Sequence, residues 1–406
     1  MIKKTLAGLS VLTIPFVTGT AYAQMEPVQS QDPHADLTVG VKAAYDGNVA
    51  GGSEELAENR NLKRQDYRFT PAISADVYKP VGPGYVSVNG SAGYDFYAHN
   101  KRLESERIQG TVGAGAILGP CGIGTSTGYS RNQSDLNDLT DDGSNTQNIE
   151  TRFNTGALIG CGAIANIQPY AVLQYETSRN SADQRKGSDS NSFTYGGGLM
   201  YSQPSVGEVR IFALQRDIDF QNRDQVLYIG ASSLRVRQLG GQFSRDIGAK
   251  LGAFVLLAYT DLDKLGEGAS GDGFNGLTWQ GKLTFRASER LRFQATAMKE
   301  TSPSLGLRVD YTERKEYSLQ AQMAFTNKVG AEVTLSHRDR RYSYPADVVA
   351  TGLTEDTIDS IRASFSVRQI GPFNVSVDTT YENRTANLES YEYDALSAGI
   401  SLSMLI

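Results

Sequence analysis

Residues 283–298 read Leu-Thr-Phe-Arg-Ala-Ser-Glu-Arg-Leu-Arg-Phe-Gln-Ala-Thr-Ala-Met, which is two alternating stretches around a polar tetrapeptide. Apolar residues occupy every second position of each stretch, and arginine, glutamine and threonine lie between them. Side chains of a β-strand point alternately to its two faces, whereas a helix brings every third or fourth residue to one face. The segment therefore predicts two strands joined by a tight turn at 287–290, with one apolar and one polar face.

The same alternation continues to the end of the chain. Segments 318–325, 332–336, 361–368 and 373–382 carry apolar residues at every second position, with polar or charged residues between them. The strands they belong to reach about ten residues, the length that a tilted strand needs to cross a membrane, whereas strands of globular sandwiches usually have about five or six. The pattern predicts an all-β fold, a transmembrane antiparallel up-and-down β-barrel.

Connections between the predicted strands alternate between short and long. Barrels of the bacterial outer membrane have short periplasmic turns and longer external loops, so this rhythm fits the fold. Eight short turns between two periplasmic chain ends imply about 18 strands, and a different assignment of 221–242 would give about 16. The short connections are 79–84, 119–122, 162–166, 203–207, 246–249, 287–290, 327–329 and 369–372, and the long ones include 47–65, 132–146, 179–189, 262–272 and 344–357.

The N-terminal segment has the three parts of a secretory signal peptide. Lys3 and Lys4 precede an apolar run at 6–16, and Ala-Tyr-Ala at 21–23 forms a cleavage site. A membrane anchor is the alternative, but the run is too short for a spanning helix and contains Pro15. We expect localisation in the outer membrane of a Gram-negative cell, with a signal peptide at 1–23, a short periplasmic segment at 24–35 and the barrel at 36–406.

The last predicted strand reads Ser-Ala-Gly-Ile-Ser-Leu-Ser-Met-Leu-Ile at 397–406. It resembles the C-terminal signal read by the barrel-assembly machinery, which has a polar residue, a glycine two positions on and hydrophobic residues at alternating positions. Ser397, Gly399, Leu402 and Met404 match this signal, while Ile406 replaces the usual terminal aromatic residue. The resemblance implies the assembly machinery as a partner.

Composition and charge narrow the function classes. The net charge of −6 argues against a nucleic-acid partner. A mean hydropathy of −0.35 together with 42 glycines and 21 tyrosines suits a barrel with one apolar and one wet face. The acidic stretches at 135–142 and 355–359 fit no EF-hand pattern, so we interpret them as solvated loops, with divalent cations beside lipopolysaccharide as the alternative. The sequence predicts no metal site and no cofactor.

Cys121 and Cys161 are the two cysteines of the chain. We expect Cys121 to open the fifth strand and Cys161 to close the sixth, at the same periplasmic rim of adjacent strands. The periplasm is oxidising, which favours a structural disulfide over the alternative of two unpaired thiols. Two thiols without suitably spaced histidines or carboxylates make a poor metal site.

The polar face of the predicted strands carries many arginines. Fixed positive charge in a lumen favours anions, whereas acids on the same face would tie the arginines into a lattice of ion pairs. Both interpretations stay open and are compatible, because a lattice can also line a channel. The predicted lumenal residues are Arg286, Arg292, Arg314, Arg338, Arg340, Arg362, Arg368, Glu316, Glu332, Asp378 and Glu382, and Arg210, Arg216, Arg235 and Arg237 could join them.

Two motifs that occur in enzymes have structural interpretations here. Gly-Thr-Ser-Thr-Gly at 124–128 matches the nucleophile elbow of hydrolases, but that motif needs a strand-to-helix turn and this one lies within a predicted strand. His337-Arg338-Asp339 matches part of the kinase catalytic loop, and the other kinase motifs are absent from the sequence. Barrels with protease or phospholipase activity exist, and His99 or His337 could serve such chemistry at the outer rim. We nevertheless expect that the protein is not an enzyme.

Aromatic residues lie near many predicted strand ends. Tyr67, Tyr94, Tyr175, Tyr259 and Tyr381 are examples. Such residues form girdles that anchor a barrel at the two membrane interfaces. A few of them could instead be stacking platforms for sugars inside the pore.

In length and architecture the chain resembles a porin family that is often encoded in exopolysaccharide gene clusters of proteobacteria. The resemblance covers 37–404, with about 18 strands, glycine-rich early strands and a moderately acidic mature chain. It implies export of a surface polysaccharide through the outer membrane, with periplasmic polysaccharide-export proteins as partners besides membrane lipid and lipopolysaccharide. The alternatives are a general or anion-preferring diffusion porin and, after it, an enzyme or an adhesive barrel.

Overall fold

A computed structural model describes residues 32–136, 147–162, 166–223, 230–303, 309–345 and 352–406 of the chain. Within these residues there are 18 strands. The first nine are β1 (His34–Asp46), β2 (Asp66–Val81), β3 (Gly84–Tyr97), β4 (Ser105–Leu118), β5 (Cys121–Gln133), β6 (Ile149–Cys161), β7 (Ile167–Asn180), β8 (Ser190–Gln203) and β9 (Gly207–Phe220). The others are β10 (Ser233–Ile247), β11 (Leu251–Leu265), β12 (Phe274–Arg286), β13 (Leu291–Pro303), β14 (Tyr311–Ala324), β15 (Val329–Ser343), β16 (Glu355–Ile370), β17 (Phe373–Ala386) and β18 (Tyr393–Leu405).

Every strand pairs antiparallel with its neighbours in the sequence, and the first strand pairs with the last. The closing ladder between β1 and β18 runs from Thr38 opposite Leu405 to Tyr45 opposite Ala398. This confirms the predicted antiparallel barrel of about 18 strands. The alternative of 16 strands is wrong, because β9, which ends at Phe220, and β10, which begins at Ser233, are two separate strands.

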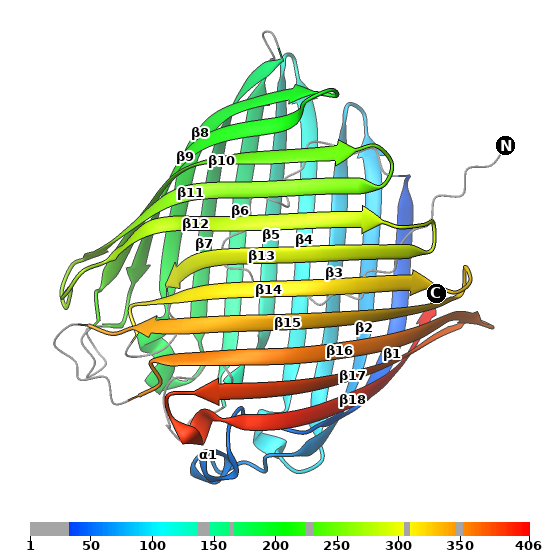
Figure 1. The fold of residues 1–406 in the computed structure, drawn as a ribbon, viewed down its shortest axis with the longest axis vertical. Coiled ribbons are helices and arrows are strands. Elements are labelled where there is room, and N and C mark those ends of the chain that lie inside the picture. Colours follow the sequence, from blue (N-terminus) through cyan, green and yellow to red (C-terminus); the bar gives the residue numbers. More distant parts are fainter. Residues whose placement is uncertain (1–31, 137–146, 163–165, 224–229, 304–308, 346–351) are drawn as a thin grey trace.

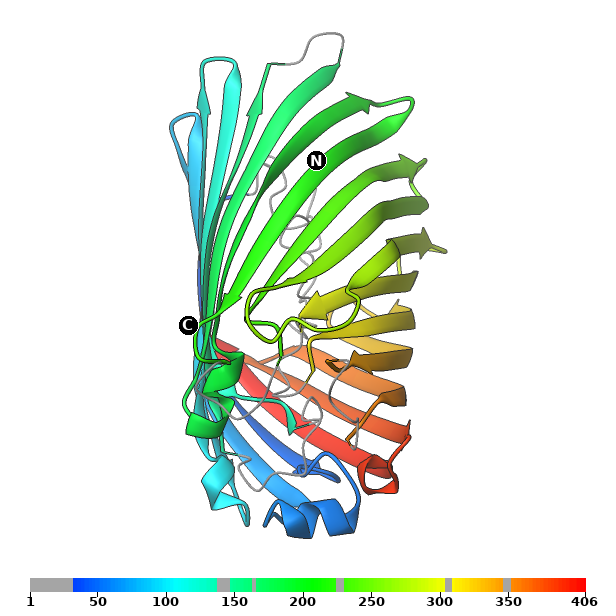
Figure 2. The same ribbon diagram turned by 90° about the vertical axis from the view of Figure 1, so that its left-hand side faces the viewer.

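The strands are strongly tilted. In Figure 1 the strands of the near wall cross those of the far wall at a large angle, and Figure 2 shows the two walls from the side. Closing a sheet into a barrel requires such a tilt. The eight predicted short connections all join consecutive strands at one end of the barrel, which we call the short-turn end. The opposite end is the long-loop end, near which Figure 1 labels α1.

Tight turns at the short-turn end depend on residues that accept a left-handed backbone. Gly119 between β4 and β5 has a φ of 61°, and Gly371 between β16 and β17 has a φ of 62°. Glycine adopts this conformation without the steric cost that a Cβ atom brings. The long-loop end is different, since its connections contain short helices, namely α1 (Glu54–Asn59), η1 (Lys101–Leu103), η3 (Asp183–Ser188) and η5 (Glu389–Tyr391).

The outward face of the barrel is apolar over most of its height. Large side chains alternate outward along each strand and remain accessible, with Leu239 67% and Leu277 60% exposed. A closed barrel leaves no unpaired edge, so an apolar outer face can contact lipid while the backbone polar groups are satisfied. Among the described residues, no helix is long and apolar enough to cross a membrane. The predicted signal peptide at 1–23 lies outside the described residues.

Candidate functional site

The inward face of the barrel is the candidate site, and strand alternation decides which side chains reach it. On β14 the exposed Tyr317 and Leu319 face outward, so Arg314 and Glu316 face the lumen. The same argument on β12 and β15–β17 places the predicted residues Arg286, Arg338, Arg340, Arg362, Glu332, Asp378 and Glu382 on the inward face. Arg292 on β13 lies directly opposite Arg286 and therefore shares that face. Arg368, the remaining predicted residue, follows the same alternation but lies beside an irregularity of β16 after Val367.

Many of these lumenal charges form ion pairs between neighbouring strands. The Arg314 Nε atom lies 3.0 Å from Glu300 and 3.8 Å from Glu316. Arg338 Nε donates to the same Glu316 over 3.0 Å. Farther round the wall, Asp378 accepts from Lys42 over 2.8 Å and lies 3.9 Å from Arg362. We call these contacts the ion-pair lattice. Such a lattice was one of the two interpretations of the lumenal arginines in the sequence, the other being an anion-preferring lining.

A band of hydroxyl groups lies beside the lattice, toward the short-turn end. The hydroxyls of Thr296 and Ser318 are 2.6 Å apart on β13 and β14, and those of Ser336 and Ser360 are 2.7 Å apart on β15 and β16. The register aligns these residues in one row across four strands. The wall therefore offers both charged and neutral hydrogen-bonding groups to a solute.

The inward face of β9–β11 contrasts with this polar wall. Phe212 and Leu214 on β9 face inward, as do Phe254 and Leu256 on β11, because Ile211, Val255 and Leu257 on the same strands are exposed outside. Sequence reasoning missed this apolar wall, since it took the inner face to be wet all round. The continuous apolar run at 253–259 was the available signal, because a strand that is apolar on both faces does not alternate.

Glycines on the inward face make room for large neighbours. Gly115 lies directly opposite Tyr85, and a Cβ atom on Gly115 would overlap the tyrosine ring. Gly240 lies opposite Phe212, with 2.7 Å between the position of such a Cβ atom and the ring. Each large side chain therefore lies along the wall over its glycine neighbour. At these two positions a close approach of a large side chain accounts for the glycine.

Described residues of the long loops pack with strand residues at the long-loop end and form a hydrophobic core, which we call the loop cap. It consists of three clusters. The β1–β6 cluster contains Ala50, Ala57, Leu62, Tyr97, Leu103 and Leu136. The α1 cluster contains Leu56, Val309, Tyr342, Leu353 and Tyr391, and the β9–β14 cluster contains Ile218, Phe220, Ala231, Leu234, Val236, Leu262, Phe274 and Tyr311.

Adjacent residues join these clusters to one another. Leu56 and Ala57 are neighbours on helix α1, yet they belong to different clusters. Val309 and Tyr311, which are two residues apart, likewise belong to the α1 cluster and to the β9–β14 cluster. The three clusters of the loop cap are thus linked through the chain at the long-loop end.

Buried charges fasten the loop cap to the barrel wall. Asp356 on β16 accepts from Arg340 over 2.6 and 2.9 Å and from Arg384 Nε over 2.7 Å. Arg384 is fully buried and also donates to the carbonyl of Gly51 in the β1–β2 loop over 3.3 Å. Arg60, likewise fully buried, donates to the carbonyls of Ala50 and Leu136. Asp356 therefore connects β15, β16 and β17, and Arg384 links this group to the loop that carries α1.

A second buried group lies in the other half of the loop cap. Asp310 lies 2.8 Å from Lys264 Nζ and 3.7 Å from Arg223 Nη1, and it also accepts from the amide of Ala231 over 3.2 Å. Burial lowers the pKa of Arg223 to about 10, and the negative charge of Asp310 opposes that shift. Asp310 thus holds the β9–β10 and β13–β14 connections together.

Two of the arginines that the sequence offered as additional lumenal residues face outward instead. Arg210 and Arg216 face the lumen, paired with Glu208 and Glu176. Arg235 and Arg237 share the outward face of β10 with the exposed Leu239, where Arg235 lies 2.7 Å from Asp217. Arg237 lies 3.4 Å from Asp261 and 3.0 Å from Asp263. Alternation shows which residues of a strand share a face, but it does not show which face points inward. The suggestion that Arg235 and Arg237 could line the lumen was therefore wrong.

The histidines considered for catalysis are engaged by carboxylates. His337 faces outward, with Nδ1 2.7 Å from Asp359 and Nε2 3.4 Å from Asp339. His99 Nδ1 lies 3.1 Å from the buried Asp66. The Gly-Thr-Ser-Thr-Gly motif at 124–128 lies within β5, without the strand-to-helix turn that would expose a nucleophilic serine. Among the described residues, no group of three potential metal ligands comes together.

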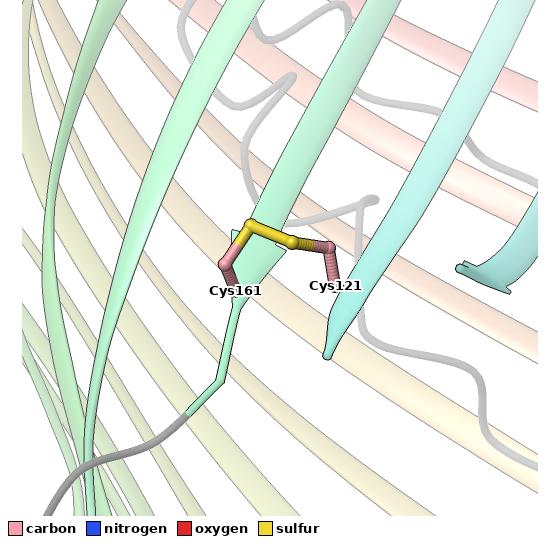
Figure 3. The surroundings of a disulfide bond; sticks show 2 residues. All are labelled: Cys121 and Cys161. Atoms are coloured by element: carbon pink, nitrogen blue, oxygen red, sulfur yellow. A yellow bond between two sulfur atoms is a disulfide. The ribbon is translucent and has the colours of Figure 1, made fainter. Parts of the chain in front are cut away.

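A disulfide joins β5 to β6 at the short-turn end. Cys121 opens β5 and lies opposite Cys161, the last residue of β6, and their sulfur atoms are bonded at 2.12 Å (Figure 3). Both cysteines share the outward face with Ile123 and Ile159, which they precede and follow by two residues. The bond therefore fastens the rim of the wall without entering the lumen.

Comparisons with known proteins gave structural neighbours only. No family model matches the chain, and no curated protein is similar to it in sequence. A BenF-like porin from Pseudomonas fluorescens Pf-5 is 12% identical with a TM-score of 0.49, and the match covers 92% of this chain and 99% of that one. Pseudomonas aeruginosa OccK2 (OpdF) is 12% identical with a TM-score of 0.48 over 92% and 98%. The siderophore receptor PirA of Pseudomonas aeruginosa is 10% identical with a TM-score of 0.44 over 93% and 81%.

Proposed function

We propose that the protein is an outer-membrane channel through which small hydrophilic solutes diffuse. The observation that carries this proposal is the contrast between the two faces of one closed wall. The outer face is apolar, while the inner face of β12–β17 carries the ion-pair lattice and the hydroxyl row. A wall of this kind suits a polar passage surrounded by lipid.

The loop cap favours small solutes over the polymer export implied by the family resemblance. A polysaccharide conduit needs a continuous opening at the outer end of the barrel. Here α1 and the connections that carry Leu353 and Tyr391 pack together at that end, which leaves less room for a polymer. We therefore prefer a diffusion porin to a channel for polysaccharide export. Periplasmic polysaccharide-export proteins would be partners only under the second interpretation.

The cellular setting follows from the same proposal. Delivery would use the signal peptide at 1–23, and insertion would use the barrel-assembly machinery, which would read Ser397, Gly399, Leu402 and Met404 on β18. Leu402 and Met404 occupy the outward-facing positions of β18, whereas Ser397 and Gly399 occupy inward-facing ones. Membrane lipid and lipopolysaccharide would surround the apolar outer face.

Single-channel conductance of the refolded mature protein in a planar bilayer tests the proposal. We expect steady conductance steps, and polyethylene glycols of increasing size should define a small cut-off. The reversal potential in a salt gradient would report the preference for anions or cations. A barrel that is correctly folded yet never conducts would contradict the channel, and passage of large polymers would favour glycan export.

A further inference from the structure

A trough in the inner wall runs along β11 near the short-turn end. It belongs to a hollow of about 780 Å³ that extends over β8–β12. Gly252 and Phe254 line the hollow from β11 and form the floor of the trough, which Leu256 continues on the same face of the strand. Phe254 is half-buried, so part of it remains accessible to a solute.

Polar residues of β10 and β12 form the two banks of the trough. The register gives three pairs, each with one residue from β10 and one from β12, namely Asp246 and Thr284 opposite Gly252, Ser244 and Lys282 opposite Phe254, and Gln242 and Gln280 opposite Leu256. All six line the hollow. Directly opposite residues have Cβ atoms about 5 Å apart, so Phe254 has polar neighbours on both sides.

The dimensions of the trough suit a small ligand. From Gly252 to Leu256 the floor extends about 14 Å at the rise of an extended strand, and the banks are two strand spacings, or about 10 Å, apart. The volume of the hollow lies within the range of about 300–1,000 Å³ that is usual for pockets that bind small molecules.

The polar groups of the banks are available to a ligand. Within the ranges that the structure describes, no side-chain hydrogen bond or ion pair of the protein engages Gln242, Gln280 or Lys282. A glutamine amide both donates and accepts hydrogen bonds. The two amides lie on opposite banks, so a ligand over the floor can contact both of them.

Charge in the hollow is nearly balanced. The banks carry one cation, Lys282, and one carboxylate, Asp246, on opposite sides of the floor. Glu208 and Arg210, farther round the hollow, lie 2.7 Å apart and neutralise each other. Arg245 borders the hollow too, but alternation places it on the outward face of β10. The trough therefore does not select for a charged solute.

We propose that the trough is a binding site for a neutral saccharide of one or two rings. A sugar ring has C–H groups on its faces and hydroxyl groups around its edge. The C–H groups would lie against the electron-rich face of Phe254, and the hydroxyl groups would meet both banks. A solute with a single polar edge would leave one bank without partners.

This site deepens the proposed channel function and rests on it, because a solute reaches the trough through the lumen. A sugar bound there occupies part of the passage and should reduce the ion current. Binding and conduction are nevertheless separate measurements, since binding can be followed on the barrel in detergent without any current.

The test uses the refolded mature barrel, with maltose, lactose and sucrose as probes. Saturation-transfer NMR in detergent measures binding, and each sugar added to a planar bilayer measures block of the current. We expect saturable transfer from the barrel to the C–H protons of at least one of these sugars. Sorbitol has the hydroxyl groups of a sugar but no ring, so it should bind more weakly.

Two variants remove the proposed contacts. Phe254→Leu keeps an apolar floor but loses the aromatic face, and it should weaken sugar binding about threefold to tenfold. Phe254→Tyr keeps the face and should retain binding. Gln280→Leu removes one amide from a bank and should also weaken binding about threefold to tenfold.

Matched controls carry the same changes outside the trough. Phe212 also faces inward, on β9, and Gln320 faces inward on β14, but neither lies among the residues that line the hollow. Phe212→Leu and Gln320→Leu should therefore leave sugar binding unchanged. The heat-dependent gel shift of folded barrels shows that each variant is folded.

The site would be overturned if none of the three sugars bound the wild type, if sorbitol bound as tightly as the sugars, or if the control variants weakened binding as much as Phe254→Leu and Gln280→Leu. Conductance without sugar binding would leave the channel and remove the site. Sugar binding without conductance would keep the site and contradict the channel.

Discussion

The aromatic ring of Tyr85 lies over Gly115, the residue directly opposite it on the next strand, and fills the place where a side chain of Gly115 would be. Replacing Gly115 with alanine should therefore force the ring away from the wall. Such overpacking usually costs about 1–3 kcal/mol of unfolding free energy. The temperature of the heat-dependent gel shift, or urea unfolding in lipid vesicles, would report this loss.

Gly124→Ala is the control for that variant. Gly124 also faces inward on a neighbouring strand, but nothing lies within 4 Å of the position its Cβ would take. We expect it to be neutral or to stabilise the fold by up to about 1 kcal/mol. Adding Tyr85→Ala should relieve the clash in Gly115→Ala. Equal unfolding temperatures for the two glycine variants would contradict the packing argument.

Asp356→Asn should loosen the loop cap. The substitution leaves the buried Arg340 and Arg384 without their shared carboxylate. Removing one partner of a buried ion pair typically costs about 3–5 kcal/mol. We expect larger or noisier conductance steps together with faster protease cleavage near α1. Glu355→Gln changes the same charge at the neighbouring, exposed position, and it should leave both measurements unchanged. Identical behaviour of the two variants would speak against a fastening role.

Asp310→Asn should affect the other half of the loop cap. Lys264 and Arg223 would lose the carboxylate between them, and the pKa of Arg223 would fall further because Asp310 now raises it. The amide of Ala231 would lose an acceptor, so its hydrogen exchange should accelerate.

Combining Asp310→Asn with Asp356→Asn tests the connection between the clusters. Strictly additive losses of stability would show that the two halves act independently.

Removing the disulfide should destabilise the barrel without changing its conductance. The loop that Cys121 and Cys161 close spans 40 residues, for which chain entropy gives about 4 kcal/mol at most. The double variant Cys121→Ser with Cys161→Ser should therefore unfold at lower urea, as should the wild type treated with a reductant. A reductant that has no effect on wild-type unfolding, while the two thiols become reactive, would count against this stabilisation.

The sequence predicted the strands and their turns well, because alternation and turn residues are local properties of the chain. The pairing of Cys121 with Cys161 needed only the positions of two strand ends. The loop cap could not be predicted in the same way. Leu56 and Leu353 are far apart in the sequence, and they come into one cluster only because several connections pack together at the long-loop end.

The lumen was predicted only in part for a related reason. Alternation separates two faces but does not say where the membrane ends, so charged outward residues such as Arg237 were offered as possible lumenal residues. It also fails where both faces are apolar, as near Phe254 and Val255. The arginines on β13–β16 were easier to place, because their strands have one clearly apolar face.

The ladder between β1 and β18 closes the sheet into a ring, so no strand is an edge strand. Thr38 lies opposite Leu405, so the chain enters and leaves on adjacent strands at the short-turn end. A peptide linker across this gap, combined with a cut at the turn containing Gly119, would produce a circular permutant with the same strand neighbours. The segment of β18 that resembles an assembly signal would then lie in the interior of the sequence, which would separate the order of synthesis from the order of strands around the ring.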